Sequence, residues 1–116
     1  MPGESKVTQR CPPDAPVFGA TRRPATDPAA DRELAGLAKA IAHPVRVQIL
    51  RMLAKKDART CSRIVDELPL AQSTVSEHLR ILREAGLVRA NERGPRVAYC
   101  IVPSALRRFK ALLEAV

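Results

Sequence analysis

The sequence predicts a mainly α-helical (α+β) domain in which one β-hairpin separates the last helix from the helices before it. Three observations support this prediction. Apolar residues recur at helical spacing in five stretches between Asp27 and Val116. One stretch, from Leu87 to Val102, instead alternates around a Gly-Pro turn. At 116 residues, the chain has the length of one domain with a modest core.

The composition limits the kind of core and partner. Hydrophobic residues make up 46% of the chain but aromatic residues only 3%, so we expect a core of Leu, Val, Ile and Ala. A net charge of +8 favours a polyanionic partner, although charge alone is weak support. The sequence has neither a membrane-length apolar run nor the apolar core of a signal peptide. We therefore expect a cytoplasmic protein with no membrane partner.

The first 26 residues differ from the rest of the chain. They hold five of the ten prolines and show no hydrophobic period. We expect residues 1–26 to form an extended arm and residues 27–116 to form the folded domain. The arm carries Cys11, which Pro12 and Pro13 follow directly.

Two helices are predicted between Asp27 and the lysines at 55 and 56. Asp27-Pro28 is typical of a helix start, and His43-Pro44 ends that helix and starts the next. His43 is better explained as a cap or a packed side chain than as a metal ligand, because no second ligand lies at helical spacing from it. The two apolar faces consist of Leu34, Leu37, Ala38 and Ile41, then Val45, Ile49, Leu50 and Leu53.

The stretch from Ile64 to Gly86 indicates two more helices, with a break at Pro69. The third helix is expected to begin with Thr60 as its N-cap, which places Cys61 in its first turn. The fourth pairs an apolar face with a short polar one; these faces are Val75, Leu79 and Leu82, and Ser73, Ser76, Glu77 and Arg80. A helix with these two faces suits the major groove of DNA, although an ordinary surface helix has the same pattern.

A β-hairpin follows, with extended runs at Leu87–Asn91 and Arg96–Val102 around a turn at residues 92–95. Arg89, Arg93 and Arg96 lie on or beside its tip, where they would meet phosphates or the minor groove. Ser104–Val116 is predicted to be the last helix, with an apolar face of Leu106, Phe109, Leu112 and Leu113.

The predicted order α-α-α-α-β-β-α is that of a winged helix-turn-helix with an additional helix at each end. The first and last helices each carry an apolar stripe that the small central unit need not cover. We expect these helices to pair across a two-fold axis, giving a homodimer that presents two reading helices to a palindromic site. The alternative is that both stripes pack within one subunit.

From about Leu37 to Val102 the chain resembles the ArsR family of small bacterial metalloregulatory repressors. The stretches that carry the resemblance are LAKAIAHPVRVQILRML, LPLAQSTVSEHLRILREAGLV and ERGPRVAYCIV. The resemblance implies a dimeric winged-helix repressor that occupies operator DNA until an inducer binds, with no cofactor required for DNA binding.

The resemblance also assigns DNA contacts to particular residues. The residues facing bases or nearby phosphates would be Gln72, Ser73, Thr74, Ser76 and Glu77. His78 and Arg80 would mainly hold the DNA backbone, and Arg93 and Arg96 would be the wing contacts. Glu77 departs from the family, in which an uncharged or basic residue is common; a glutamate would accept from cytosine N4 or repel phosphate. His78 has an equally strong structural interpretation, as a hydrogen-bonding residue at the edge of the core.

The sensor region departs further from the family. A paired-cysteine run resembling Glu-Leu-Cys-Val-Cys-Asp-Leu in many relatives is reduced to Thr60-Cys61-Ser62-Arg63. The last helix has no histidine and a single acidic residue, Glu114, so a zinc site of the His/Asp type is not expected. With that zinc site set aside, the remaining candidate for a sensor is thiol chemistry. The three cysteines are too few for a structural disulfide framework, so they are available for it.

The candidate metal ligands are Cys11, Cys61 and Cys100, which would form a trigonal thiolate site for As(III), Sb(III) or another thiophilic ion. Cys61 is the best candidate, because a helix N-terminus lowers the pKa of a thiol. The alternative for each cysteine is a small buried apolar side chain.

Three functions are compatible with this pattern. The first is a repressor released by arsenite, antimonite or another thiophilic ion. The second keeps DNA binding but replaces the metal with a thiol–disulfide redox switch. The third is a constitutive DNA-binding regulator without a sensor site. An enzyme is not expected, because no catalytic set of residues or phosphate-binding glycine loop is visible.

Overall fold

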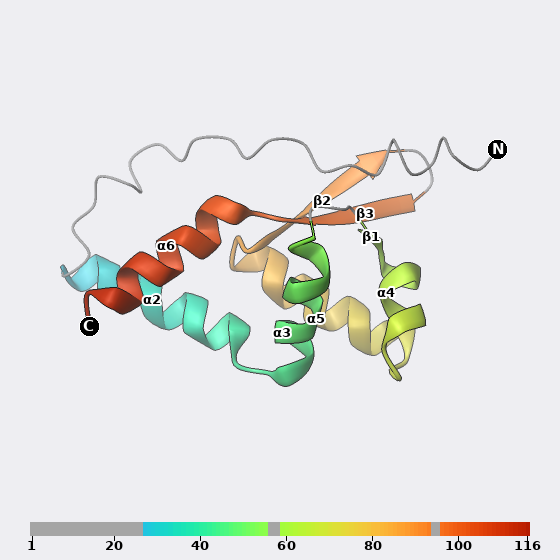
Figure 1. Ribbon diagram of the computed structural model, residues 1–116, viewed down its shortest axis with the longest axis horizontal. Coiled ribbons are helices and arrows are strands. Elements are labelled where there is room, and N and C mark those ends of the chain that lie inside the picture. Colours follow the sequence, from blue (N-terminus) through green and yellow to red (C-terminus); the bar gives the residue numbers. More distant parts are fainter. Residues whose placement is uncertain (1–26, 56–58, 94–95) are drawn as a thin grey trace.

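The computed structural model describes residues 27–55, 59–93 and 96–116. Its elements are α2 (Pro28–Ile41), α3 (Pro44–Leu53), β1 (Arg59–Thr60), α4 (Cys61–Glu67), α5 (Gln72–Glu84), β2 (Val88–Arg93), β3 (Arg96–Ile101) and α6 (Pro103–Glu114). Helices α2 and α6 lie side by side at one end of the molecule, with α4 at the other end and α3 and α5 between them (Figure 1). The predicted order is confirmed, with one additional strand, and the expected arm lies outside the described residues.

Helices α2 and α3 begin where the sequence predicts. The Asp27 carboxylate accepts a hydrogen bond from the backbone N–H of Ala30, at 2.6 Å. The Nδ1 atom of His43 accepts one from the backbone N–H of Val45, at 3.1 Å. A proline follows each cap at the first helical position, where its missing N–H costs nothing. His43 is therefore a cap, as expected.

The strands form a sheet of order β1-β3-β2, antiparallel throughout. Strand β1 was not predicted; it pairs Arg59 with Tyr99 and Thr60 with Ala98. The predicted turn at residues 92–95 was too long, because Glu92 pairs with Val97 and Arg93 with Arg96. Backbone pairing with β3 thus extends β2 through residues whose polar side chains had suggested a turn.

A sharp corner joins α5 to the hairpin. Gly86 has φ 85°, in the left-handed region that favours glycine. The N–H of Leu87 donates to the Leu82 carbonyl and that of Gly86 to the Arg83 carbonyl, both at 3.0 Å, which is the Schellman pattern. The Leu87 carbonyl then accepts from the Val102 N–H at 2.9 Å. The start and the end of the hairpin are thereby tied to the end of α5.

The core is aliphatic, as the composition predicts, and all of the helices and the sheet contribute to it. Three residues of α5 are fully buried, and Ile64 of α4 lies in the same cluster. The largest fully buried side chains of this cluster are Ile49, Leu53, Ile64, Leu79, Leu82, Leu87 and Leu112. The predicted core face of α5 is confirmed.

Helices α2 and α6 pack against each other within one chain. Their contact buries Leu37 and Leu112, and the Arg108 guanidinium donates to both oxygens of Glu33, each at 3.0 Å. The two apolar stripes therefore pack in part within one subunit. Leu113 stays 54% exposed and Val116 93% exposed at the end of α6. Both apolar side chains are thus open to solvent.

Replacing Gly86 with alanine tests the corner. No atom lies within 4 Å of a Cβ built at this position, so the cost comes from the positive φ alone. We expect Gly86→Ala to lower the free energy of unfolding by about 1–2 kcal/mol. Urea unfolding at fixed chain concentration measures the change.

Gly36, in the interior of α2, is the matched control. A Cβ there also meets nothing within 4 Å, and the backbone is helical. Gly36→Ala should therefore raise the free energy of unfolding, by about 0.5–1 kcal/mol. Changes of the same sign in both variants would contradict this account of Gly86.

Candidate nucleic-acid interface

Helices α4 and α5 form a helix-turn-helix in which α5 presents one face outward. Val75, Leu79 and Leu82 of α5 have no exposed surface. Because side chains at helical spacing share a face, the opposite face must point away from the core. The exposed residues of α5 include Gln72, Ser73, Thr74, Ser76, Glu77 and Arg80. All but one of the α5 residues assigned to DNA are thus exposed. Ser73, Ser76, Glu77 and Arg80 share the outward face, with Gln72 and Thr74 exposed beside it in the first turn.

The start of α5 is electrostatically positive. Ala71 at the N-cap provides no side-chain acceptor, and the first turn contains no acidic residue. The partial positive charge of the helix N-terminus is therefore not neutralised by a cap or a carboxylate of its own helix. An anionic group such as a phosphate would be favoured beside Gln72 and Ser73.

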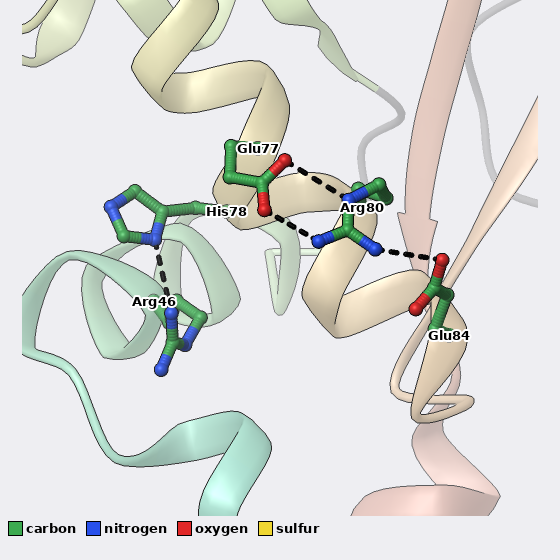
Figure 2. A network of polar contacts seen from close by, with 5 residues as sticks. All are labelled: Arg46, Glu77, His78, Arg80 and Glu84. Carbon is green, nitrogen blue, oxygen red and sulfur yellow. Dashed lines mark hydrogen bonds and ion pairs between the residues drawn. The ribbon is translucent and has the colours of Figure 1, made fainter.

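Glu77 and Arg80 contact each other on the exposed face of α5. The Arg80 Nε and NH2 groups donate to the two carboxylate oxygens of Glu77, and NH1 donates to Glu84 (Figure 2). These bonds with Arg80 hold the pKa of the Glu77 carboxyl below its usual value. Both carboxylates raise the pKa of Arg80. Glu77 is therefore ionised and paired, not simply a carboxylate that faces solvent.

His78 is half-buried and points away from this exposed face, toward α3 (Figure 2). Its Nδ1 atom lies 3.2 Å from the NH1 group of Arg46. Since a guanidinium can only donate, Nδ1 must be the acceptor, which leaves the proton of the neutral ring on Nε2. Arg46 also donates through Nε to the Ala40 carbonyl, at 2.6 Å. One arginine side chain thus links the end of α2 to α5.

The two histidines of the sequence lie against each other. The rings of His43 and His78 are 4.5 Å apart between centroids and tilted by 46°. Burial lowers the pKa of His78, and electrostatic interactions with His43 and Arg46 lower it further, against a smaller opposing effect of Glu77. The neutral form of His78 is favoured. These contacts favour the structural interpretation of His78, while its Nε2–H remains a donor.

The hairpin forms the wing expected beside the reading helix. Its last paired residues before the tip are Arg93 and Arg96, which face each other across the two strands. The backbone of both residues therefore lies at the tip, as predicted for wing contacts. Their side chains lie outside the described part of the chain.

Cys100 is fully buried in β3 and is disulfide-bonded. The other cysteines of the sequence are Cys11 and Cys61, and both side chains lie outside the described residues. The backbone of Cys61 begins α4 directly after Thr60, which pairs with Ala98 of β3. Among the side chains that the structure describes, no three His, Cys, Asp or Glu residues lie close enough together to hold a metal ion.

Three partners in this region were not predicted from the sequence. Glu84 lies four residues after Arg80, so helical spacing could have identified the pair. Arg46 lies 32 residues before His78, and no local pattern reveals that contact. The ring contact of His43 with His78 is likewise visible only once α3 and α5 are packed together.

The lowered pKa of His78 predicts a pH-dependent stability. Above its ordinary pKa of about 6.5, His78 is neutral in both states and the fold keeps its full stability. As the pH falls below that value, the unfolded chain takes up a proton before the folded chain does, so the free energy of unfolding decreases. Urea unfolding between about pH 5 and pH 8 measures this slope.

The variant His78→Asn isolates the contribution of His78. Asparagine keeps an acceptor near the Arg46 guanidinium but does not titrate. The slope of stability against pH should become shallower than in the wild type. An unchanged slope would show that another group is responsible.

Within the described residues, no helix is long and apolar enough to cross a membrane.

A helix-turn-helix domain family matches residues 41–90 of the chain. An uncharacterised helix-turn-helix transcriptional regulator of Methanocaldococcus jannaschii is 37% identical over 76 residues, covering 66% of this chain and 85% of that protein. The transcriptional repressor SmtB of Mycobacterium tuberculosis is 39% identical over 94 residues, covering 80% of this chain and 67% of that protein.

Two solved structures have the same fold. An ArsR-like transcriptional regulator from Rhodococcus has a TM-score of 0.68 and 25% identity, covering 75% of this chain and 81% of that chain. A homodimeric winged helix-turn-helix DNA-binding domain from Mycobacterium bovis, described as a possible ArsR-family regulator, has a TM-score of 0.65 and 29% identity, covering 80% and 86%. Three of these four proteins are described as transcriptional regulators and the fourth as a possible one, in agreement with the expectation that the chain is not an enzyme. With the helix-turn-helix, the wing and these relatives in agreement, this chain belongs to the ArsR family of winged-helix transcriptional regulators.

Proposed function

We propose that this protein is a homodimeric repressor that binds a palindromic operator and is released by chemistry at its cysteine thiols. The observation that supports operator binding best is the orientation of α5. Its apolar stripe is fully buried, so its outer face offers short polar side chains to the major groove. In this docking Gln72, Ser73, Thr74 and Ser76 contact base edges or nearby phosphates, while Arg93 and Arg96 of the wing contact phosphates.

A homodimer follows from the remaining apolar surface and from the relatives. The similar domain of Mycobacterium bovis is described as homodimeric. In this chain Leu113 and Val116 stay exposed beside the α2–α6 pair, where a second copy would cover them. Two reading helices related by a two-fold axis require a palindromic site. Repression, as in the relative SmtB, is the regulatory sign that we propose.

The leading candidate for the trigger is a thiophilic ion such as arsenite or antimonite. The disulfide of Cys100 supports this choice, because a second cysteine sulfur must lie beside Cys100. Once the disulfide is reduced, two thiols at least are adjacent. Each thiol would replace one hydroxyl of arsenous acid and release one water, so that three cysteines give a trithiolate and three waters. Cys11, Cys61 and Cys100 are the proposed ligands.

The same observation favours redox sensing as a second candidate. In this reaction two thiols reduce one molecule of hydrogen peroxide, form the disulfide and release two waters. Strand β3 carries Cys100 and pairs with β1, which leads directly into α4. A bond made or broken at Cys100 would therefore act on the helix-turn-helix through the sheet. In this case no metal ion is needed.

Alanine substitutions at the proposed interface should separate base reading from phosphate binding. Gln72→Ala or Ser73→Ala should lower operator affinity by about 1–3 kcal/mol and relax the preference at particular base pairs. Arg93→Ala or Arg96→Ala should weaken binding to every sequence and reduce the salt slope by about one unit. Arg51→Ala removes the same charge from an exposed position of α3, outside α5, the wing and the α2–α6 pair, and is the control. If the control changes operator affinity and the four interface variants do not, the proposed docking on DNA is wrong.

Release experiments on each Cys→Ser variant should distinguish the triggers. The reduced protein bound to its operator would be titrated with arsenite, zinc, cadmium and peroxide. We expect arsenite to release the wild type and to fail on Cys100→Ser, because the proposed site loses a ligand. Release by peroxide alone supports the redox switch. If none of the four releases the protein, both sensor proposals fail and a constitutive regulator remains.

A further inference from the structure

Each nitrogen of the Arg80 guanidinium already donates to a carboxylate when no DNA is bound. The guanidinium donates through Nε to Glu77 Oε1 at 3.0 Å and through NH2 to the other Glu77 oxygen. Its NH1 group donates to Glu84 at 2.8 Å (Figure 2). We refer to Glu77 and Glu84 as the acidic clamp. The clamp occupies the Nε–NH2 edge, one of the two edges through which a guanidinium pairs bidentately with a phosphate.

The clamp does not serve to hold the fold together. The side chains of Arg80, Glu77 and Glu84 are 49%, 55% and 64% exposed, all on one helix. Ion pairs this exposed contribute little to stability, because water solvates and screens both partners. Arg80 can therefore exchange its carboxylate partners for others without loss of structure.

The clamp also removes positive charge from the helix that faces DNA. Helix α5 carries two arginines and two glutamates, so its ionised side chains add no net charge. The whole chain has a net charge of +8. Attraction to phosphates supplies most non-specific DNA affinity, so a reading helix without net charge contributes little to it.

We propose that the acidic clamp is a specificity gate, which withholds Arg80 from arbitrary DNA phosphates and makes Glu77 a specificity-determining residue. The proposal rests on the operator-binding function proposed above. A phosphate that takes Arg80 from the clamp leaves a glutamate unpaired beside the negatively charged backbone. An operator that offers Arg80 an acceptor and Glu77 a donor at base edges avoids that repulsion, as guanine and cytosine would. The gate thus disfavours wrong sites more than the right one.

A double-mutant cycle tests the gate. The probes are a duplex selected by the wild-type protein from a random-sequence library and a scrambled duplex of equal length. Glu77→Gln should tighten binding to the scrambled duplex by roughly three- to tenfold and steepen its salt slope by about one unit. Operator affinity should change less, so the specificity ratio falls. In the Arg80→Ala background, Glu77→Gln should tighten binding to the scrambled duplex clearly less, because the carboxylate is neutralised but no arginine is released to a phosphate.

The control is Asp66→Asn on α4, which changes the net charge equally at an exposed residue outside the clamp. A tightening by Glu77→Gln that is equally large in the Arg80→Ala background would overturn the gate, since repulsion of phosphate by Glu77 alone would explain it. Weaker operator binding by Glu77→Gln with unchanged scrambled binding would also overturn it, in favour of direct base reading. A wild-type protein that binds neither duplex overturns the proposed function as well, whereas an operator-selective protein unaffected by Glu77→Gln overturns the gate alone.

Discussion

Burial of the apolar stripe of α5 is the constraint on which the rest of the structure depends. Val75, Leu79 and Leu82 fill the space between α3, α4 and the sheet, and burying each contributes about 1.5–3 kcal/mol. Rotating α5 about its axis would bring these side chains into water, so the core fixes the direction of the opposite face. The placement of every exposed polar residue on this helix follows from that requirement.

Most of the fold could be predicted because its signals are local. Proline next to Asp27 or His43 marks the helix starts, and the apolar period identifies each buried face. Strand β1 could not be predicted, since two residues carry no period and its pairing partner lies about forty residues away. The length of β2 was underestimated for a related reason. Glu92 and Arg93 have turn-like side chains, but pairing with β3 decides their backbone conformation.

The candidate interface was predictable to the same degree. Helical spacing identifies Ser73, Ser76, Glu77 and Arg80 as one exposed face, and the structure agrees. Helical spacing does not reveal whether a residue on this helix also makes a tertiary contact within the fold. His78 belongs to the same helix, yet its ring bonds to Arg46 and packs on His43, which come from the turn into α3. Tertiary packing had to be known before its structural role could be separated from a role at DNA.

The left-handed residue at the end of α5 has a mechanical consequence. Hydrogen bonds on both sides of Gly86 fix the angle between α5 and the hairpin, and the Leu87–Val102 bond fixes where α6 departs. We therefore expect the reading helix, the wing and the terminal helix to move together as one rigid body. A tilt of a few degrees between the α2–α6 pairs of two subunits would then displace each reading helix, which lies far from the pivot. The distance between the two reading helices would change, and with it the fit to half-sites one helical turn of DNA apart, while neither helix needs to unfold.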